Sequence, residues 1–398
     1  MTPISFGVDD PPPVSITNAA VAIGNFDGVH VGHRRLIAVL RSEARKLDVP
    51  AVVVCLYPHP ASVLRPDSAP ATLLWPDRRA CLLAAAGANR VAFLNVAPKL
   101  LALSAEEFFD RVLVGKLRVR ALVEGENFRF GKARRGDVAL LRRMCQDANV
   151  SMTAVPLVDD DGSAVSSTRI REAVAAGDVR VAADMVGRRH CIRGIVGAGA
   201  RRGRTIGFPT ANLASVLGLV PAPGVYSAIA RFDDGRTYAA ACNIGANPTF
   251  DEYAAKIEVH LLDFADDVYG QAMEVEFVDR IREVKTFKGP GELVAQIKAD
   301  VEQARTDVEA LPPRPIQPEL AATIAEWVRW ETSPSLAPLD VFLEQARFDE
   351  PGVLRLDWIF GAALPSHATI DLLFGLEERL REVFPEVDHV ASSTPQSY

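Results

Sequence analysis

The strongest constraint on the fold of this chain is a short apolar run followed directly by a segment rich in glycine and histidine. Residues 21–24 read VAIG, as in a buried parallel strand, and NFDGVHVGH follows at 25–33. Leu36, Ile37 and Leu40 then recur at helical spacing, which predicts an amphipathic helix directly after the turn. The sequence therefore predicts a strand–turn–helix unit of a parallel α/β sheet.

Two histidines flank this turn, and His33 falls in the first turn of the predicted helix. Unpaired backbone N–H groups and the helix dipole favour phosphate at that place. Imidazoles there can donate hydrogen bonds to the charge that develops on a phosphoryl group during transfer. Taken alone, the short string HVGH is equally typical of a structural turn with two surface histidines.

The longer string GNFDGVHVGH is more specific. It resembles the nucleotide-binding motif of the nucleotidylyltransferase superfamily, in the form found in bacterial bifunctional riboflavin kinase/FAD synthetase. The resemblance implies that His30 and His33 act in catalysis. It also implies a nucleotide-binding loop made of Gly24, Asn25, Phe26, Asp27 and Gly28.

Composition excludes several classes of protein. A chain of 398 residues that is 48% hydrophobic predicts two or three globular domains, and the net charge of -7 argues against a nucleic-acid partner. The five scattered cysteines without a C-x-x-C pair indicate neither a disulfide framework nor a zinc site. Because no signal-peptide pattern and no apolar run of ~20 residues occurs, we expect a cytoplasmic protein with no membrane partner.

Strand and helix patterns alternate after the first motif. Residues 51–56 and 90–94 are strand-like, residues 78–86 are helical in pattern, and Ser104 to Glu107 is a helix start of the capping-box type. Such alternation predicts βαβ units and a parallel sheet.

Two loops of this region carry further candidate residues. Prolines on both sides of His59 fix that ring at the carboxyl end of a strand, although a structural histidine in a rigid turn is about as plausible. In ENFRFGK at 126–132, Phe128 and Phe130 can stack on a flat ring while the basic residues meet phosphates; a solvated basic loop is the alternative. The resemblance implies nucleotide or flavin contacts from His59, Asn127, Phe128 and Arg129.

The string SSTRIR at 166–171 combines hydroxyls at a helix start with arginines, as a phosphate cradle does. By itself it is also typical of a simple N-cap. It matches the second signature of the nucleotidylyltransferases, which implies that Ser166, Ser167 and Thr168 bind the ATP phosphates and that Arg169 neutralises their charge. The resemblance thus assigns residues 1–186 to a Rossmann-like FMN adenylyltransferase domain.

The pattern changes to short strands between glycine turns over residues 187–310, which predicts a small antiparallel β-barrel. In GRTIGFPTAN at 203–212, the neutral oxygens of Thr210 and Asn212 are suited to Mg²⁺, although a glycine-rich loop alone is weak evidence. GFPTAN resembles the riboflavin kinase signature. The resemblance implies a Greek-key barrel in which Thr210 and Asn212 hold the metal, and nucleotide contacts from Gly203, Gly207, Phe208 and Pro209.

Residues 256–262 alternate, with Glu258 and His260 on one face of the predicted strand. A carboxylate fixed beside a bound nucleotide can accept the proton of an attacking hydroxyl, although alternation alone favours a solvent-facing residue. In riboflavin kinases the glutamate of this E-x-H element is the proposed base. That role maps onto Glu258.

Residues 311–398 lie beyond the resemblance and read as a proline-rich linker with an α/β extension of unknown role. Helices are expected over 320–330 and 370–384, a strand over 353–360, and a disordered end over 391–398.

The whole pattern predicts a bifunctional enzyme that uses ATP and Mg²⁺ to convert riboflavin to FMN and FMN to FAD. A single-activity enzyme and a non-catalytic flavin- or nucleotide-binding regulator are the alternatives. The oligomeric state is not readable from the sequence.

Overall fold

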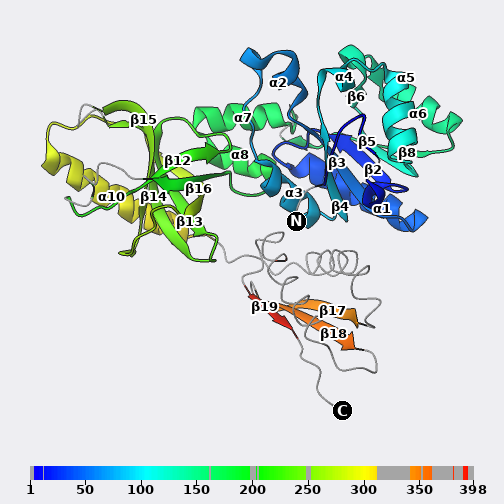
Figure 1. The fold of residues 1–398 in the computed structure, drawn as a ribbon. Helices are drawn as coiled ribbons and strands as arrows, with labels where there is room; N and C mark the ends of the chain where they lie inside the picture. Colours follow the sequence, from blue (N-terminus) through cyan, green and yellow to red (C-terminus); the bar gives the residue numbers. More distant parts are fainter. Residues whose placement is uncertain are drawn as a thin grey trace. The chain divides into compact units, whose positions relative to one another are not determined.

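The computed structural model describes residues 4–11, 13–160, 163–197, 203, 206–247, 252–311, 341–350, 353–360, 380 and 389–392 (Figure 1). Packing divides the chain into two compact units. The first comprises Met1–Pro70, Pro76–Ala164 and Pro313–Tyr398, and the second comprises Ala71–Trp75 and Val165–Pro312. Among the described residues, no helix is long and apolar enough to cross a membrane.

A parallel sheet with strand order β1-β4-β3-β2-β5-β8 forms the centre of the first unit. The strands are β1 (Ile4–Phe6), β2 (Ala20–Gly24), β3 (Ala51–Tyr57), β4 (Arg90–Asn95), β5 (Ala121–Gly125) and β8 (Ser151–Val155). The predicted strands are therefore confirmed, with β3 and β4 one residue longer than expected. Because the chain leaves β2 toward β3 on one side while β5 lies on the other, the order reverses beside β2, and open α/β sheets bind ligands at such a point.

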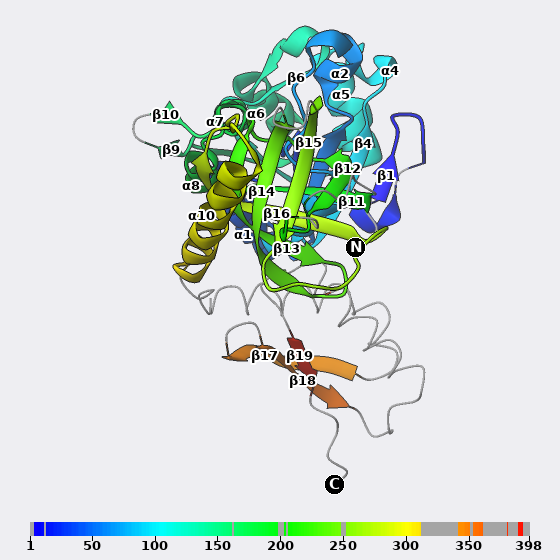
Figure 2. The same cartoon turned by 90° about the vertical axis from the view of Figure 1, so that its left-hand side faces the viewer.

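Helices cover both faces of this sheet (Figures 1 and 2). The amphipathic helix α1 (Val31–Leu47) buries Leu36, Ile37 and Leu40, as predicted, and contacts β2, β3 and β5. Side chains of α5, η3 and α6 pack with Val21 and Ile23 on the opposite face. The helices are α2 (Pro60–Leu64), α3 (Pro76–Ala85), α4 (Pro98–Leu101), α5 (Ala105–Phe108), the π-helical segment η3 (Phe109–Lys116) and α6 (Val138–Asp147). Short pieces are η1 (Val14–Ile16), η2 (Pro66–Ser68), η4 (Lys132–Arg134), β6 (Arg129–Phe130), β7 (Gly136–Asp137), β9 (Asp159–Asp160) and β10 (Ser163–Ala164).

The capping box predicted at Ser104 is present. The Ser104 hydroxyl accepts from the Glu107 amide at 3.1 Å, and the Glu107 carboxylate accepts from the Ser104 amide at 2.8 Å. This reciprocal pair satisfies backbone donors that the first turn of α5 leaves unbonded.

The second unit is a closed antiparallel barrel with strand order β11-β12-β15-β14-β13-β16 (Figure 2). Its strands are β11 (Cys191–Gly197), β12 (Ala211–Leu217), β13 (Gly224–Phe232), β14 (Thr237–Asn247), β15 (Glu252–Leu261) and β16 (Ala272–Arg282). Val259, Cys242 and Phe277 are among the side chains that fill it, so alternate residues of each strand face outward. Helices α7 (Ser167–Ala176) and α8 (Val179–Val186) precede the barrel and belong to the same unit.

Helix α10 (Pro290–Glu309) packs on β13, β14 and β16. An ion pair holds it to the barrel: Arg282 Nη2 lies 2.7 Å from the buried Asp300 Oδ2, and its Nε donates to the same carboxylate. Pro290 starts the helix well because its missing N–H would be unbonded there in any case.

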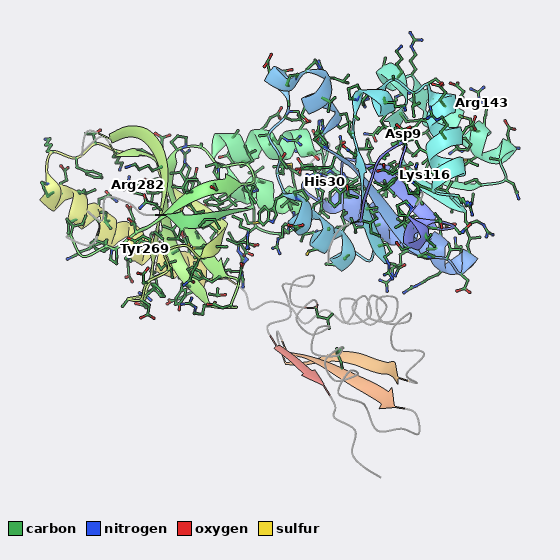
Figure 3. The ribbon with its side chains drawn as sticks, viewed as in Figure 1. Asp9, His30, Lys116, Arg143, Tyr269 and Arg282 are labelled. Carbon is green, nitrogen blue, oxygen red and sulfur yellow. The ribbon has the colours of Figure 1, made fainter. Side chains whose placement is uncertain are left out.

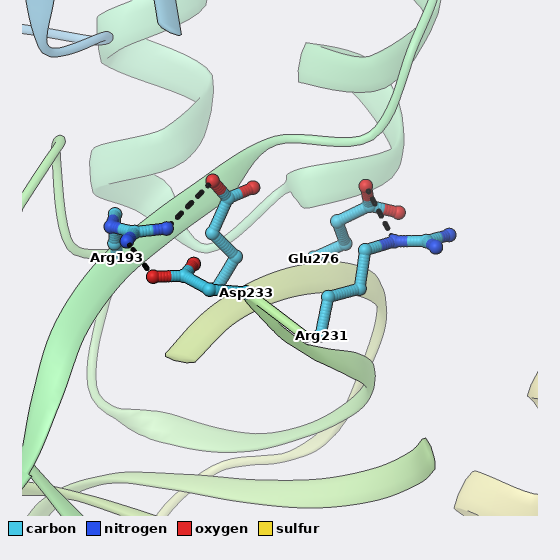
Figure 4. Close-up of polar contacts among 5 residues, drawn as sticks. Arg193, Arg231, Asp233 and Glu276 are labelled. Atoms are coloured by element: carbon cyan, nitrogen blue, oxygen red, sulfur yellow. Dashed lines mark hydrogen bonds and ion pairs between the residues drawn. The ribbon is translucent and has the colours of Figure 1, made fainter. Parts of the chain in front are cut away.

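Charged side chains cross the outer surface of β11, β13 and β16 (Figure 4). Arg193 lies 2.7 Å from Asp233 and 3.4 Å from Glu274, and Arg231 lies 3.3 Å from Glu276. The Arg193–Glu274 and Arg231–Glu276 pairs join neighbouring strands, whereas Asp233 lies in the turn between β13 and β14.

None of the five cysteines forms a disulfide, and all five are buried. Burial raises the pKa of Cys55 to about 12, with a further increase from the negative charge of Asp27 and an opposing effect of Arg79. These thiols act as small apolar side chains of the core.

The C-terminal region contains a sheet of order β17-β18-β19, made of β17 (Val341–Glu350), β18 (Val353–Phe360) and β19 (His389–Ser392). The strand predicted at 353–360 is confirmed. The expectation of disorder from residue 391 is wrong for Ala391 and Ser392, which pair in parallel with β18. The helix predicted at 320–330, and that at 370–384 apart from Leu380, lie outside the described residues.

Candidate active sites

The loop after β2 has an unusual backbone. Phe26 has a φ of 47°, Gly28 of 88° and Val29 of 41°, all in the left-handed region. Glycine adopts such angles readily, whereas a β-branched valine does so at a cost, and strain of this kind gathers at functional loops. Gly24 also lacks room for a side chain, because an added Cβ would lie 3.3 Å from the Phe26 ring.

Both predicted histidines lie at the N-terminal end of α1, where His30 is the N-cap (Figure 3). Their rings stack with centroids 3.7 Å apart, and the His33 ring lies 5.1 Å from that of Phe26. Gly32 makes room for this stack, since a Cβ there would approach the His30 ring to 3.1 Å. The sequence HVGH thus places two imidazoles at the mouth of a helix that favours anions.

Arg79 of α3 supports the same loop through its guanidinium group. Its Nη2 lies 3.0 Å from Asp27 Oδ1, and its Nη1 donates to the Asn25 carbonyl at 3.1 Å. Both partners of the ion pair are buried. The structure therefore gives Asp27 a supporting contact within the protein, and its predicted contact with nucleotide remains a prediction.

His59 ties the loop after β2 to the end of β3. Its Nε2 lies 3.1 Å from the Asn25 side-chain amide, and its Nδ1 accepts from the Ala61 amide at the start of α2. Two residues predicted from separate motifs are thus brought together at the carboxyl edge of the sheet.

The loop after β5 uses its two phenylalanines differently from expectation. Phe130 is only 5% exposed and packs in the core, so the suggestion that it stacks on a ligand is wrong. Phe128 is half-buried and stacks on Phe130 with centroids 5.6 Å apart, which leaves it as the aromatic candidate. Asn127 and Arg129 are exposed, and Arg129 lies 3.1 Å from Asp137.

Glu124 sits beside this loop and was not selected from the sequence. Strands β2 and β5 pair at Ala20–Ala121 and Val21–Leu122, and beyond these pairs the Glu124 carboxylate accepts from the Ile23 amide at 2.8 Å. Burial raises the pKa of this carboxyl well above its usual range, while the bond from Ile23 lowers it. The side chain thus replaces a ladder acceptor where the two strands separate.

The S-S-T-R element begins α7 in the second unit. Ser166 is the N-cap, and its hydroxyl accepts from the Arg169 amide at 3.3 Å, so the capping interpretation is confirmed. Ser167 and Thr168 occupy the first turn, and the Arg169 side chain is half-buried. Their predicted contacts with phosphate remain predictions.

In the barrel, a tight turn precedes β12. The Phe208 amide donates to the Gly203 carbonyl at 2.7 Å, and a Cβ on Gly203 would lie 2.2 Å from the Phe208 carbonyl oxygen. Gly207 has a φ of +86° with open space around it. The two glycines therefore allow a closed turn that leads through Pro209 to Thr210.

Strand register brings the predicted kinase residues together. Glu258 of β15 pairs directly with Asn212 of β12 and with Asn243 of β14, so the three side chains form a row on the outer face of the barrel. All three are half-buried. Burial raises the pKa of Cys242 to about 12, and the nearby charge of Glu258 adds to this shift.

Hard oxygen donors dominate this row, with the Thr210 hydroxyl one residue before β12. Among the described residues, no group of three His, Cys, Asp or Glu side chains is placed to hold a metal ion. Thr and Asn oxygens together with nucleotide phosphates are the ligands that suit Mg²⁺.

Sequence reasoning missed Arg79 and Glu124 as supporting residues, and it did not select Asn243, which pairs with Glu258. A carboxylate inside the apolar run ALVEG was a visible signal for Glu124, because such residues are rarely buried without a specific role. Arg79 offered no comparable signal, since its partner lies 52 residues away.

Comparison with known proteins agrees with the prediction of two functional domains. The FAD synthetase family model matches residues 13–169, and the riboflavin kinase family model matches residues 186–308. A bifunctional riboflavin kinase/FMN adenylyltransferase from Pseudomonas fluorescens is 40% identical over 71% of this chain and 91% of its own length. The protein of that name from Bacillus subtilis is 35% identical over 72% and 91%.

A crystal structure described as a macrolide-efflux protein from Streptococcus pneumoniae has a TM-score of 0.68 and 32% identity, covering 76% of this chain and 99% of that one. Residues 309–398 lie beyond both family models. With two family models in the expected order and relatives above 30% identity, this chain belongs to the family of bifunctional riboflavin kinase/FMN adenylyltransferases.

Proposed function

We propose that this chain phosphorylates riboflavin with ATP to give FMN and then joins FMN to the AMP part of a second ATP, which gives FAD and pyrophosphate. The observation that carries the proposal is the register of β15 with β12, which sets Glu258 opposite Asn212 beside the Thr210 turn. A carboxylate, an amide and a hydroxyl in this arrangement match what transfer of phosphate to an alcohol requires.

In the kinase step, Glu258 accepts the proton of the riboflavin 5′-hydroxyl as its oxygen bonds to the γ-phosphorus of ATP and the bond to ADP breaks. Thr210 and Asn212 would hold Mg²⁺, which when bound neutralises charge on the phosphates. Gly203 and Gly207 let the phosphates approach the backbone, and Phe208 with Pro209 flanks the nucleotide.

In the adenylyl transfer step, the FMN phosphate attacks the α-phosphorus of ATP and pyrophosphate leaves. A phosphate is already anionic at neutral pH, so this step needs alignment and charge neutralisation rather than a strong base. His30 and His33 donate to the phosphoryl oxygens, and Arg169 neutralises the leaving pyrophosphate. Contacts to nucleotide or flavin come from Gly24, Asn25, Phe26, Asp27, Gly28, His59, Asn127, Phe128, Arg129, Ser166, Ser167 and Thr168.

By this proposal residues 1–186 form the adenylyltransferase, residues 187–310 the kinase and residues 311–398 a linker with an extension. Packing groups residues 165–186 with the barrel, so the motif boundary and the packing boundary differ by one helical hairpin. We place the reactions in the cytoplasm, with ATP, riboflavin and FMN as the partners.

The test supplies purified full-length protein with riboflavin, ATP and Mg²⁺ and separates the products by chromatography. Both FMN and FAD are expected. His30→Ala should stop the sequence at FMN, and Glu258→Ala should block FMN while sparing FAD made from supplied FMN. A regulator without turnover would give neither product, and loss of both steps by one substitution in a folded protein would contradict the two-site proposal.

A further inference from the structure

His260 lies on β15, as Glu258 does, and contacts the turn that holds the residues proposed to bind metal and phosphate. His260 Nδ1 lies 2.7 Å from the Pro209 carbonyl oxygen, a short bond in which the ring N–H donates. The edge of one ring faces the other between Phe208 and His260, with centroids 5.5 Å apart and an interplanar angle of 73°. The ring therefore contacts two consecutive residues of the turn.

The bond lies where the strand ladder ends. Strands β12 and β15 pair at Ala211–Val259 and Asn212–Glu258, so the next position in this register would set Thr210 opposite His260. Pro209 has no N–H and cannot continue a ladder. The His260 side chain thus supplies a cross-strand bond at a point where the backbone does not.

One charged neighbour of this ring, Asp263, is already bound by another residue. Asp263 follows β15, but Arg305 of α10 binds its carboxylate through two bonds of 2.7 and 3.0 Å. The Arg305 bond is the chief reason that the pKa of Asp263 lies below its usual range, with a smaller effect of His260. His260 therefore contacts the Pro209 carbonyl of the turn, whereas the Asp263 carboxylate is bound by Arg305.

We propose that His260 is a positioning residue of the kinase site, which clamps the turn through the Pro209 carbonyl and so fixes Thr210 and Asn212 relative to Glu258. The proposal rests on the assignment of the kinase step to the barrel. Its physical basis is alignment: Thr210 and Asn212 must present the metal–phosphate unit to the base Glu258 on the neighbouring strand. Displacement by about 1 Å at a reacting centre can cost roughly 100-fold in rate.

Two nearly isosteric variants separate the clamp from a general structural role. In His260→Asn the amide Nδ2 occupies the place of the imidazole Nδ1, so the bond to Pro209 is retained. In His260→Gln the amide lies one bond farther out, at the place of Nε2, so the bond is lost. Both variants replace the ring by an amide and remove its contact with Phe208.

The experiment measures kcat and KM for ATP in FMN formation at fixed Mg²⁺, together with FAD formation from supplied FMN and the thermal midpoint. We expect His260→Gln to lower kcat/KM for ATP roughly 10- to 100-fold, with a raised KM, while FAD formation stays within about twofold. His260→Asn should stay within about threefold of the parent protein.

Equal losses in the two variants would overturn the proposal, because then the bond to Pro209 does not matter. Parent-like kinetics of His260→Gln would overturn it as well, as would a loss of active protein with unchanged KM. Failure of the parent protein to form FMN would instead contradict the proposed kinase function itself. The four outcomes are therefore distinguishable.

Discussion

The two candidate sites differ in how their polar side chains are buried and held in position. In the sheet unit, His30 and Asp27 are 7% and 3% exposed and sit on a loop with three left-handed residues, supported from beneath by Arg79. In the barrel, Asn212 and Glu258 are half-buried on regular strands, aligned by register. A site of cationic and neutral donors suits an anionic nucleophile, whereas an alcohol nucleophile calls for a carboxylate.

This comparison implies that the sheet site depends on side-chain support from a helix, and the barrel site on backbone pairing between β12 and β15. The variant Arg79→Met is the strongest test of the support inferred for the sheet site. It leaves Asp27 buried without its cation, and breaking such a pair costs about 3–5 kcal/mol. We expect a drop of that size in the free energy of unfolding, measured by urea denaturation.

The double variant Arg79→Met with Asp27→Asn is the matched control, because it leaves no unpaired buried charge. It should recover most of the lost stability. If the single variant lost less than about 1 kcal/mol, the ion pair would be as weak as an exposed one and the inferred support would be wrong.

Gly32→Ala tests whether the stacked imidazoles need their spacing. The new Cβ would lie 3.1 Å from the His30 ring and displace it, so FAD formation from FMN should fall roughly 10-fold with FMN formation unchanged. Gly291→Ala is the matched control: both glycines are the second residue of a helix, and nothing lies within 4 Å of a Cβ at Gly291. Equal rates of FAD formation in the two variants would contradict the inferred fit.

Through Glu124, the stability of the sheet unit should depend on pH. The pKa of this carboxyl is raised in the folded protein, so above the ordinary carboxyl pKa the unfolded chain loses this proton while the folded chain keeps it. The contribution of this group to stability is therefore fully present below about pH 4.5 and is lost as pH rises toward the folded value, at a slope of up to about 1.4 kcal/mol per pH unit.

Glu124→Gln keeps an acceptor for the Ile23 amide but cannot titrate. Its unfolding free energy relative to the parent protein should rise between pH 5 and pH 7 by about 1 kcal/mol or more, in paired urea melts. A pH-independent difference would show that the Glu124 carboxyl ionises normally in the folded protein.

The smallest effect is expected on the outer surface of the barrel. Arg193→Ala removes pairs to Asp233 and Glu274 that are partly solvated, so it should cost only about 0.5–1 kcal/mol, and less in 1 M salt. Both product-forming activities should be unchanged. A loss above about 3 kcal/mol would mean that this cluster behaves as a buried network.

How much the sequence could predict depends on how far apart along the chain the interacting residues lie. The strand predicted at 51–56, the capping box at Ser104 and the shared face of Glu258 and His260 are local patterns, and all three are present. The partner of Arg79 is 52 residues away and that of Glu124 is 101 residues away, so no local pattern indicates either contact.

The same limit explains the wrong role given to Phe130. The spacing of two phenylalanines gives no sign of which ring is inside. Close packing decides that: the Phe130 ring lies so near Gly136 that a Cβ added there would be only 2.7 Å from it. Motif strings did predict the turns and helix starts on which the candidate residues lie, because a turn and its helix are encoded by neighbours.

The burial of every cysteine has a practical consequence. The thiols of Cys55, Cys145 and Cys242 have pKa values raised to about 12, 11 and 12, chiefly by burial, and thiolate is the form that reacts with alkylating reagents. The native protein should therefore resist maleimide dyes. A single cysteine engineered onto the surface of each unit would then carry a fluorophore selectively, so that distance changes during turnover can be followed by energy transfer without a cysteine-free background.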